Sequence, residues 1–265
     1  MNLLKPESVK RKTERRAWSV LVLCLLLGSC ATDGGSGVSK PSPGEGNETI
    51  NVDPFAAQSA PAPVPAREPT WNVVFENDWS DENVGQEPAD LFILDGAFLV
   101  TETNGNKMLT LPGAPVGDFG FLFGPRVKGK PAELRARMLS TRKGRRMPAF
   151  AAGLGGVNGY RLRLNAAARN LRLSRGEETL ATVPHVWKSG VWTNLRFRAE
   201  PKGDDGAAVS AKVWPADEEE PADWTLLHDD PEPYGGGKCT LWGYPYAGTE
   251  ILFDDLQVLA FEPAE

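Results

Sequence analysis

Histidine and cysteine are scarce in this sequence. It has 265 residues, of which two are histidines and three are cysteines. Cys24 and Cys30 lie near the N-terminus, which leaves Cys239 without a partner for a disulfide in the folded part. Burial and hydrogen bonds between chain segments must therefore hold the fold together. With His185 and His228 as the only imidazoles, Cys239 is expected to be a small buried apolar side chain and not a nucleophile.

Apolar runs long enough to cross a membrane are also lacking. The run at residues 17–27 is about half as long as the roughly 20 residues that a transmembrane helix needs. Basic residues precede it, as in an export signal. The segment Leu27-Gly28-Ser29-Cys30 resembles the lipobox of bacterial lipoproteins, in which the cysteine is lipidated and becomes the first residue of the mature chain. The resemblance implies a signal peptide at residues 1–29 and a membrane anchor on Cys30.

The next segment, residues 30–69, has almost no aromatic side chains and many glycine, serine, proline and alanine residues. Such a composition cannot bury enough surface to fold, so we expect a disordered tether. It would connect the lipid on Cys30 to a folded domain at residues 70–263, exported and held at the cell envelope. An ordinary secretory signal that ends in cysteine and a twin-arginine signal at Arg15-Arg16 are the alternatives.

Long amphipathic helices are absent from the folded part. From residue 71 onward, short runs with apolar and polar residues in alternation are separated by glycine and proline, which is typical of strands. We expect about 13 strands and an all-β, two-sheet antiparallel sandwich. The expected strands are 71–76, 97–101, 107–111, 119–123, 132–139, 150–154, 160–165, 171–174, 178–183, 192–199, 209–214, 224–227 and 251–261.

Charge is unevenly distributed along the chain. Residues 126–212 hold 19 Lys or Arg and 6 Asp or Glu, whereas the rest of the mature chain holds 4 and 27. Within the expected strands, alternation places arginines on the side opposite the apolar residues. They either pair with the acidic flanks or, if their strands are neighbours in one sheet, form a basic surface for an anionic ligand. The set contains Arg135, Arg137, Arg161, Arg163, Arg172, Arg196 and Arg198, and the loop at residues 142–146.

Five short motifs follow one another along the folded part. They are Phe75-Glu76-Asn77-Asp78-Trp79, 94–100, 159–164, 190–196 and 251–258. Their order resembles the concanavalin A-like lectin/glucanase jelly rolls, especially the laminin-G-like modules of bacterial exported proteins, over roughly residues 71–262. The resemblance implies a jelly roll whose first and last strands pair, which would bring Asp78 near Asp254. Such folds host sugar-binding modules, glycoside hydrolases and scaffolding domains, so the fold alone does not select a function.

A recognisable set of catalytic carboxylates is missing. A glycoside hydrolase needs two carboxylates that flank the bond it cleaves. Laminarinase-type members of the superfamily carry Glu, Asp and Glu at alternating positions of one strand. Glu76, Asp78 and Glu82 come nearest, but the last spacing differs. We therefore predict no catalytic residue and keep a glycoside hydrolase-like or keto-sugar hydrolase-like enzyme as an alternative.

Three aspartates offer a metal site as one interpretation. Asp254 and Asp255 of the last expected strand, together with Asp78 just after the first one, would supply the oxygen ligands that calcium prefers. In the other interpretation these aspartates accept hydrogen bonds from backbone or tryptophan groups of the first-strand turn. A structural calcium ion is the one cofactor considered for this chain.

Aromatic side chains gather in the segment 234–246, whose glycines predict a loop. Trp242, Tyr244 and Tyr246 have faces that can stack on sugar rings or form a protein interface. The sequence thus predicts a lipid-anchored, non-catalytic module outside the cytoplasm. Its partner would be a carbohydrate, an acidic polysaccharide included, or another envelope component, and no nucleic acid is expected. A structural protein-interaction domain is a further alternative.

Overall fold

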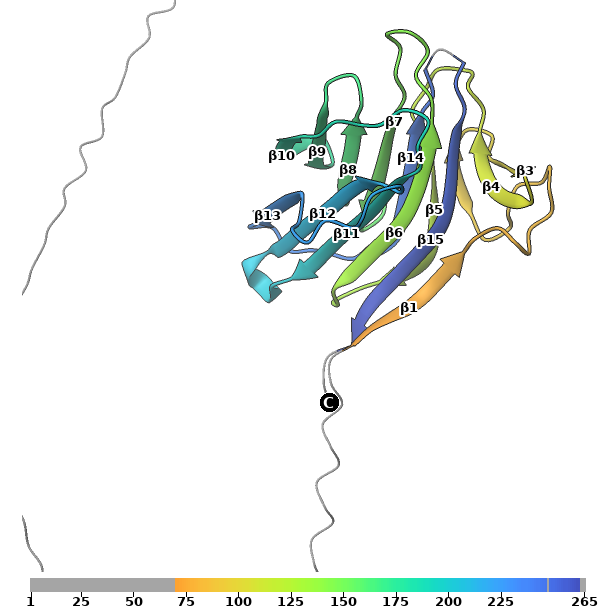
Figure 1. The fold of residues 1–265 in the computed structure, drawn as a ribbon. Helices are drawn as coiled ribbons and strands as arrows, with labels where there is room; N and C mark the ends of the chain where they lie inside the picture. Colours follow the sequence, from red (N-terminus) through yellow and green to blue (C-terminus); the bar gives the residue numbers. More distant parts are fainter. Residues whose placement is uncertain (1–69, 247, 263–265) are drawn as a thin grey trace, which may run out of the picture. The chain divides into compact units, whose positions relative to one another are not determined.

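The computed structural model describes residues 70–246 and 248–262 as two antiparallel β-sheets packed face to face (Figure 1). Sheet A contains, in order, β13 (Leu226–Asp230), β12 (Ala207–Pro215), β11 (Thr193–Pro201), β6 (Ala132–Ser140), β15 (Ile251–Glu262), β4 (Asn106–Leu111) and β3 (Leu99–Thr103), and β1 (Thr70–Asn77) also pairs with β15. Sheet B contains β10 (Glu178–Pro184), β9 (Asn170–Arg175), β8 (Tyr160–Asn165), β7 (Ala149–Leu154), β14 (Gly237–Tyr244), β5 (Phe119–Val127) and β2 (Phe92–Asp95). The all-β sandwich predicted from the alternation is confirmed.

Helical structure is limited to one short 3-10 helix, η1 (Gly203–Asp205), within the described residues. In this part of the chain no helix has the length and apolar character to span a bilayer. The predicted signal peptide at residues 1–29, the lipidation site Cys30 and the tether at residues 30–69 lie outside the described residues and stay predictions.

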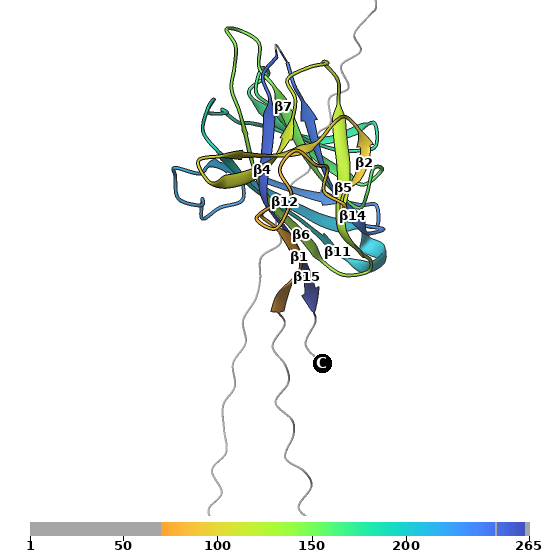
Figure 2. The same ribbon diagram turned by 90° about the vertical axis from the view of Figure 1, so that its right-hand side faces the viewer.

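The first and last strands pair, as the family resemblance implies. β1 runs antiparallel to β15, with Thr70 opposite Glu262 and Asn77 opposite Leu256. Figures 1 and 2 show the outer ends of these strands side by side at one end of the sandwich, which we call the proximal end. Ser140 pairs with Ile251 at the other end of β15. The hairpin that follows β6 therefore lies at the opposite end, which we call the distal end.

Aromatic rings join the two sheets in the core. Phe121 of β5 meets Phe253 of β15 edge to face, with centroids 5.8 Å apart, and Phe98 lies 5.0 Å from Phe121. All three are fully buried, and burial of one such side chain contributes about 1.5–3 kcal/mol. Cys239 of β14 is buried in the same core, which raises the pKa of its thiol to about 12. The expectation of a buried, unreactive thiol is consistent with this environment.

The segment that contains β14 was wrongly interpreted from its glycines as a loop. It forms a strand between β7 and β5 in the middle of sheet B. A Cβ on Gly243 would lie 2.7 Å from the Leu111 side chain, so this glycine allows the sheets to approach closely. Leu241 is buried and Trp242 points to the outer face. The short strand β2 was also missed.

Candidate functional site

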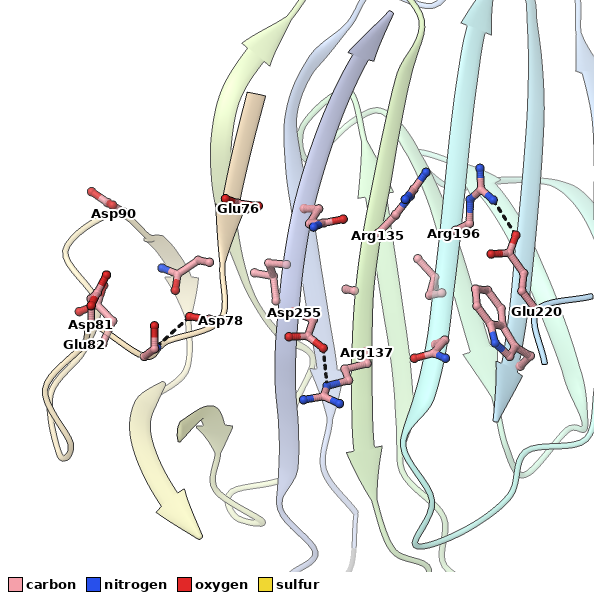
Figure 3. Close-up of a pocket in the computed structure, with 18 residues that line it drawn as sticks. Glu76, Asp78, Asp81, Glu82, Asp90, Arg135, Arg137, Arg196, Glu220 and Asp255 are labelled. Carbon is pink, nitrogen blue, oxygen red and sulfur yellow. Dashed lines mark hydrogen bonds and ion pairs between the residues drawn. The ribbon is translucent and has the colours of Figure 1, made fainter. Parts of the chain in front are cut away.

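A groove of about 870 Å³ crosses the outer face of sheet A (Figure 3). Its floor consists of β15, β6, β11 and β12, and its walls are the loop after β1 and the segment around Glu220. Seven lining side chains are carboxylates and three are arginines. The carboxylates are Glu76, Asp78, Asp81, Glu82, Asp90, Glu220 and Asp255, and the arginines are Arg135, Arg137 and Arg196. The groove is therefore polar and has an excess of negative charge.

The acidic wall is fixed by the turn after β1. The Asn77 side-chain oxygen accepts a hydrogen bond from the Trp79 N–H at 2.7 Å, and Asp78 accepts one from the Ser80 N–H at 3.0 Å. The Trp79 side chain is fully buried, and its Nε1 donates to the carbonyl of Phe253 at 3.0 Å. The hydrogen bonds from Ser80 lower the pKa of Asp78. Asp78 is thus held ionised at the edge of the groove.

A β-bulge in β15 places two adjacent aspartates beside Arg137. The register with β6 shifts after Asp254, and Asp255 has a φ of 49°, in the left-handed region that few residues other than glycine adopt. Asp254 is buried and accepts hydrogen bonds from Asn106 at 3.0 Å and from Arg137 at 2.7 Å. The Nε of Arg137 lies 2.9 Å from the Asp255 carboxylate (Figure 3). One guanidinium therefore holds both carboxylates.

Asp255 has a raised pKa. Partial burial is the largest cause, the charges of Asp254 and Asp78 raise the pKa further, and Arg137 acts against them. Arg137 occupies oxygens that a calcium ion would need. Within residues 70–246 and 248–262, no group of three or more His, Cys, Asp or Glu is arranged to hold a metal ion. The calcium interpretation of Asp78, Asp254 and Asp255 therefore gains no support from the structure.

Glu133 is a fully buried carboxylate on the arginine-bearing side of β6. It accepts hydrogen bonds from Arg135 at 2.6 Å, Arg196 at 3.0 Å and Arg198 at 2.8 Å. The Trp224 ring covers the cluster, with its centroid 5.1 Å from the Arg198 guanidinium. Burial alone would raise the pKa of Glu133, but the three arginines outweigh burial and lower it. These arginines are therefore held in place by a negative charge within the fold.

The predicted arginine set does not form one surface. Arg135, Arg137, Arg196 and Arg198 lie on sheet A, whereas Arg161, Arg163 and Arg172 lie on sheet B, where Trp242 and Tyr244 also point outward. Acidic flanks pair with the basic block. The pairs include Arg137 with Asp254, Arg161 with Asp118, Arg175 with Asp230, Lys188 with Asp217 and Arg196 with Glu220. Internal pairing thus accounts for much of the charge pattern.

Sequence reasoning missed several polar or aromatic residues of the groove, namely Ser80, Asp81, Asp90, Asn194, Trp214, Glu220 and Gln257. Asn194 pairs in register with both Arg137 and Trp214, and Gln257 pairs with Arg135. Alternation from Arg196 would have placed Asn194 on the same face. Gln257 could not be placed in this way because the bulge changes the alternation of β15.

The structure brings the three carboxylates that came nearest to a hydrolase motif into the groove. Glu76 lies on β1, while Asp78 and Glu82 follow it in the loop, and all three line the groove with Asp255 (Figure 3). Their clustering comes from the turn after β1 and from the pairing of β1 with β15. It does not require the alternating positions on one strand that were used as the criterion.

No protein-family model and no curated protein sequence matches this chain. Solved structures do match. The Emp47p carbohydrate recognition domain has a TM-score of 0.52 at 8% identity and covers 72% of this chain and 96% of that one. A protein of unknown function with a galectin-like fold from Bacillus subtilis has a TM-score of 0.51 at 13% identity, covering 73% and 100%. The metal-free form of the Emp46p carbohydrate recognition domain has a TM-score of 0.50 at 10% identity, covering 71% and 97%.

The domain has a concanavalin A-like jelly-roll fold. At these identities the likeness concerns the fold, and the jelly roll by itself does not select a function. What this jelly roll can do is decided by its own groove and surface.

Proposed function

We propose that this protein is a lipid-anchored, extracytoplasmic carbohydrate-binding module whose ligand lies in the sheet A groove. The observation that carries the proposal is the convergence of carboxylates, amides, guanidinium groups and the Trp214 indole on one open groove. Sugar hydroxyls both donate and accept hydrogen bonds, so they match a mixed set of donors and acceptors. An indole face also suits the apolar side of a sugar ring. The carbohydrate recognition domains with the same fold support this proposal.

The net negative charge of the groove decides which glycans can bind there. The groove has seven carboxylates against three arginines, and each of these arginines already has a carboxylate partner. An acidic polysaccharide would be repelled, because like charges in a concave site destabilise binding. We therefore propose a neutral or amino sugar as the ligand of the groove. Lipid on Cys30 and a tether of about 38 residues, roughly 35 Å in r.m.s. length, would present this groove at the cell envelope.

The groove variant Asn194→Ala/Gln257→Ala tests the site. Both amides line the groove, and no hydrogen bond joins either of them to another side chain within the described residues, so both are available to a ligand. Loss of two hydrogen bonds at about 0.5–1.5 kcal/mol each should weaken glycan binding by roughly 5-fold to 150-fold. The measurement is a glycan array followed by calorimetry on the full chain in detergent.

Asn158→Ala is the matched control, because Asn158 is an exposed amide that does not line the groove. It should bind as the native chain does. Equal affinities of the groove variant and the native chain would place the ligand elsewhere. Absence of any bound glycan would overturn the proposal, and a co-purifying protein in that case would favour the protein-interaction alternative.

A glycoside hydrolase is the second candidate, because one groove holds carboxylates whose pKa values are shifted in opposite directions. The raised pKa of Asp255 suits a general acid, and the lowered pKa of Asp78 suits an ionised base or nucleophile. If this candidate is correct, native protein hydrolyses a bound oligosaccharide, and Asp255→Asn lowers the rate at least 100-fold while glycan affinity is retained. Reducing-end release measures this. A native chain that binds glycans without any turnover contradicts it.

A further inference from the structure

The hairpin at the distal end, residues 141–148, has an unusual charge. It contains Arg142, Lys143, Arg145 and Arg146 and no acidic residue. Lys143 and Arg146 exchange both backbone hydrogen bonds, at 3.0 and 3.1 Å, and Gly144 supplies the positive φ of 63° that a type II′ turn needs. The Arg142 N–H donates to the Ser189 hydroxyl oxygen at 2.9 Å and the Gly190 N–H donates to the Ser140 carbonyl at 3.0 Å, which fixes the base of the hairpin. Figures 1 and 2 show the backbone of this hairpin at the end of the sandwich opposite to the start of β1 and the end of β15.

These four cations differ from the arginines of the strands. Residues 141–146 are all exposed, and none of the four takes part in an ion pair with another described residue. By contrast, Arg137, Arg161 and Arg196 each pair with a carboxylate. The hairpin thus carries positive charge that the described part of the fold does not neutralise.

The hairpin continues into a row of aromatic and arginine side chains on sheet B. The Arg146 guanidinium lies 6.0 Å from the Tyr246 ring centroid, Tyr246 stacks on Tyr244 with centroids 6.3 Å apart, and Arg163 lies 5.6 Å from the Tyr244 ring. Arg161 lies 4.3 Å from the Trp242 ring. We call this row and the four cations of the hairpin the distal cationic surface.

The row also has more positive than negative charge. Asp118 is the shared carboxylate partner of Arg161 and Arg163, and Arg172 pairs in register with Arg163. Burial lowers the pKa of Arg163, the positive charges of Arg161 and Arg172 lower it further, and Asp118 acts against them. An added anion would relieve this repulsion between like charges.

We propose that the distal cationic surface is a second ligand site, which binds an anionic polysaccharide through its carboxylate or sulfate groups. Arginine forks match both anions in bidentate geometry, and the stacked faces of Tyr244 and Tyr246 offer a platform for sugar rings. The hairpin has no exposed apolar side chain that would enter a bilayer, since Met147 is partly buried against the core. A polysaccharide therefore fits this surface better than an anionic membrane does. The inference is independent of the ligand in the sheet A groove.

The experiment compares two double variants of the full chain in detergent. Arg145→Gln/Arg146→Gln removes two hairpin cations, and Arg126→Gln/Lys128→Gln removes two exposed cations near the proximal end that have no ion pair within the described residues. Binding of fluorescent heparin, polygalacturonate and neutral dextran is measured over a range of salt concentrations. Phosphatidylglycerol vesicles are the lipid probe.

We expect native protein to bind heparin or polygalacturonate at low salt. Dextran carries no charge and should not bind at this surface. The hairpin variant should bind roughly tenfold more weakly, and its slope of log Kd against log salt should fall by about one for each cation removed. The proximal variant should match native protein. Equal losses in both variants, no binding at low salt, or binding to vesicles without binding to either polysaccharide would each overturn the proposal.

Discussion

Replacement of Glu133 by glutamine is expected to lower the free energy of unfolding by about 3–5 kcal/mol. Glu133 is 0% exposed and accepts hydrogen bonds from Arg135, Arg196 and Arg198. Glutamine keeps the shape of the side chain but leaves three packed guanidinium groups without their shared negative charge. Denaturation by guanidinium chloride measures the loss, with unfolding followed by tryptophan fluorescence.

The control for this change is Glu262→Gln. Glu262 pairs with Lys130 at 2.9 Å, but both side chains are 44% exposed, so its loss should cost at most about 1 kcal/mol. The pH dependence gives a second check. The pKa of Glu133 is lowered in the folded state from the ordinary glutamate value of 4.5. The stabilisation by Glu133 is therefore complete at a pH above 4.5 and is lost as the pH falls below 4.5. Equal costs for the two variants would show that the cluster contributes no more than a surface pair.

Replacement of Trp79 by alanine is expected to cost about 3–5 kcal/mol and to weaken glycan binding in the groove. The Trp79 side chain is fully buried, and its Nε1 bonds the Phe253 carbonyl, which fixes the turn that carries Asp78. Trp79→Phe keeps an aromatic ring but leaves that carbonyl without its donor, so a smaller cost of about 1–3 kcal/mol is expected. Chemical denaturation and glycan titration together measure both effects.

Val84→Ala is the matched control, because Val84 lies in the same loop and is 51% exposed. Its stability and its glycan affinity should stay close to those of the native chain. If Trp79→Ala changes stability while glycan affinity stays native, the loop does not form part of the ligand site. If all three variants are equally stable, the indole does not fix the turn.

Alternation of apolar and polar residues was sufficient to predict the fold class and the faces of most strands. In β6 and β11, arginines and apolar residues lie on opposite faces as expected, because side chains alternate wherever one face is buried. The resemblance to jelly rolls correctly predicted that β1 pairs with β15. The glycines of β14 led to the wrong prediction of a loop, whereas Gly243 allows the two sheets to pack closely.

The neighbours of each strand could not be derived from alternation. Arg137 and Arg161 occupy similar outward positions in the sequence pattern, yet they lie on different sheets because long-range pairing decides the order of strands. The same limit applies to Glu133. Alternation places it on the side of Arg135 and Arg137, but only the pairing of β6 with β11 brings Arg196 and Arg198 to it and buries it. The bulge at Asp255 was also hidden, since it depends on the local twist and pairing of β15.

The pairing of Thr70 with Glu262 has a consequence for the evolution of such a domain. Because Thr70 and Glu262 are register partners on adjacent strands, the two ends of the folded unit lie next to each other. A unit of this kind can be inserted into a surface loop of another protein with little strain on either partner, since entry and exit points almost coincide. It can equally be placed at the end of a chain. The jelly roll can therefore be moved between architectures as a module, and the grooves and surfaces that it carries move with it.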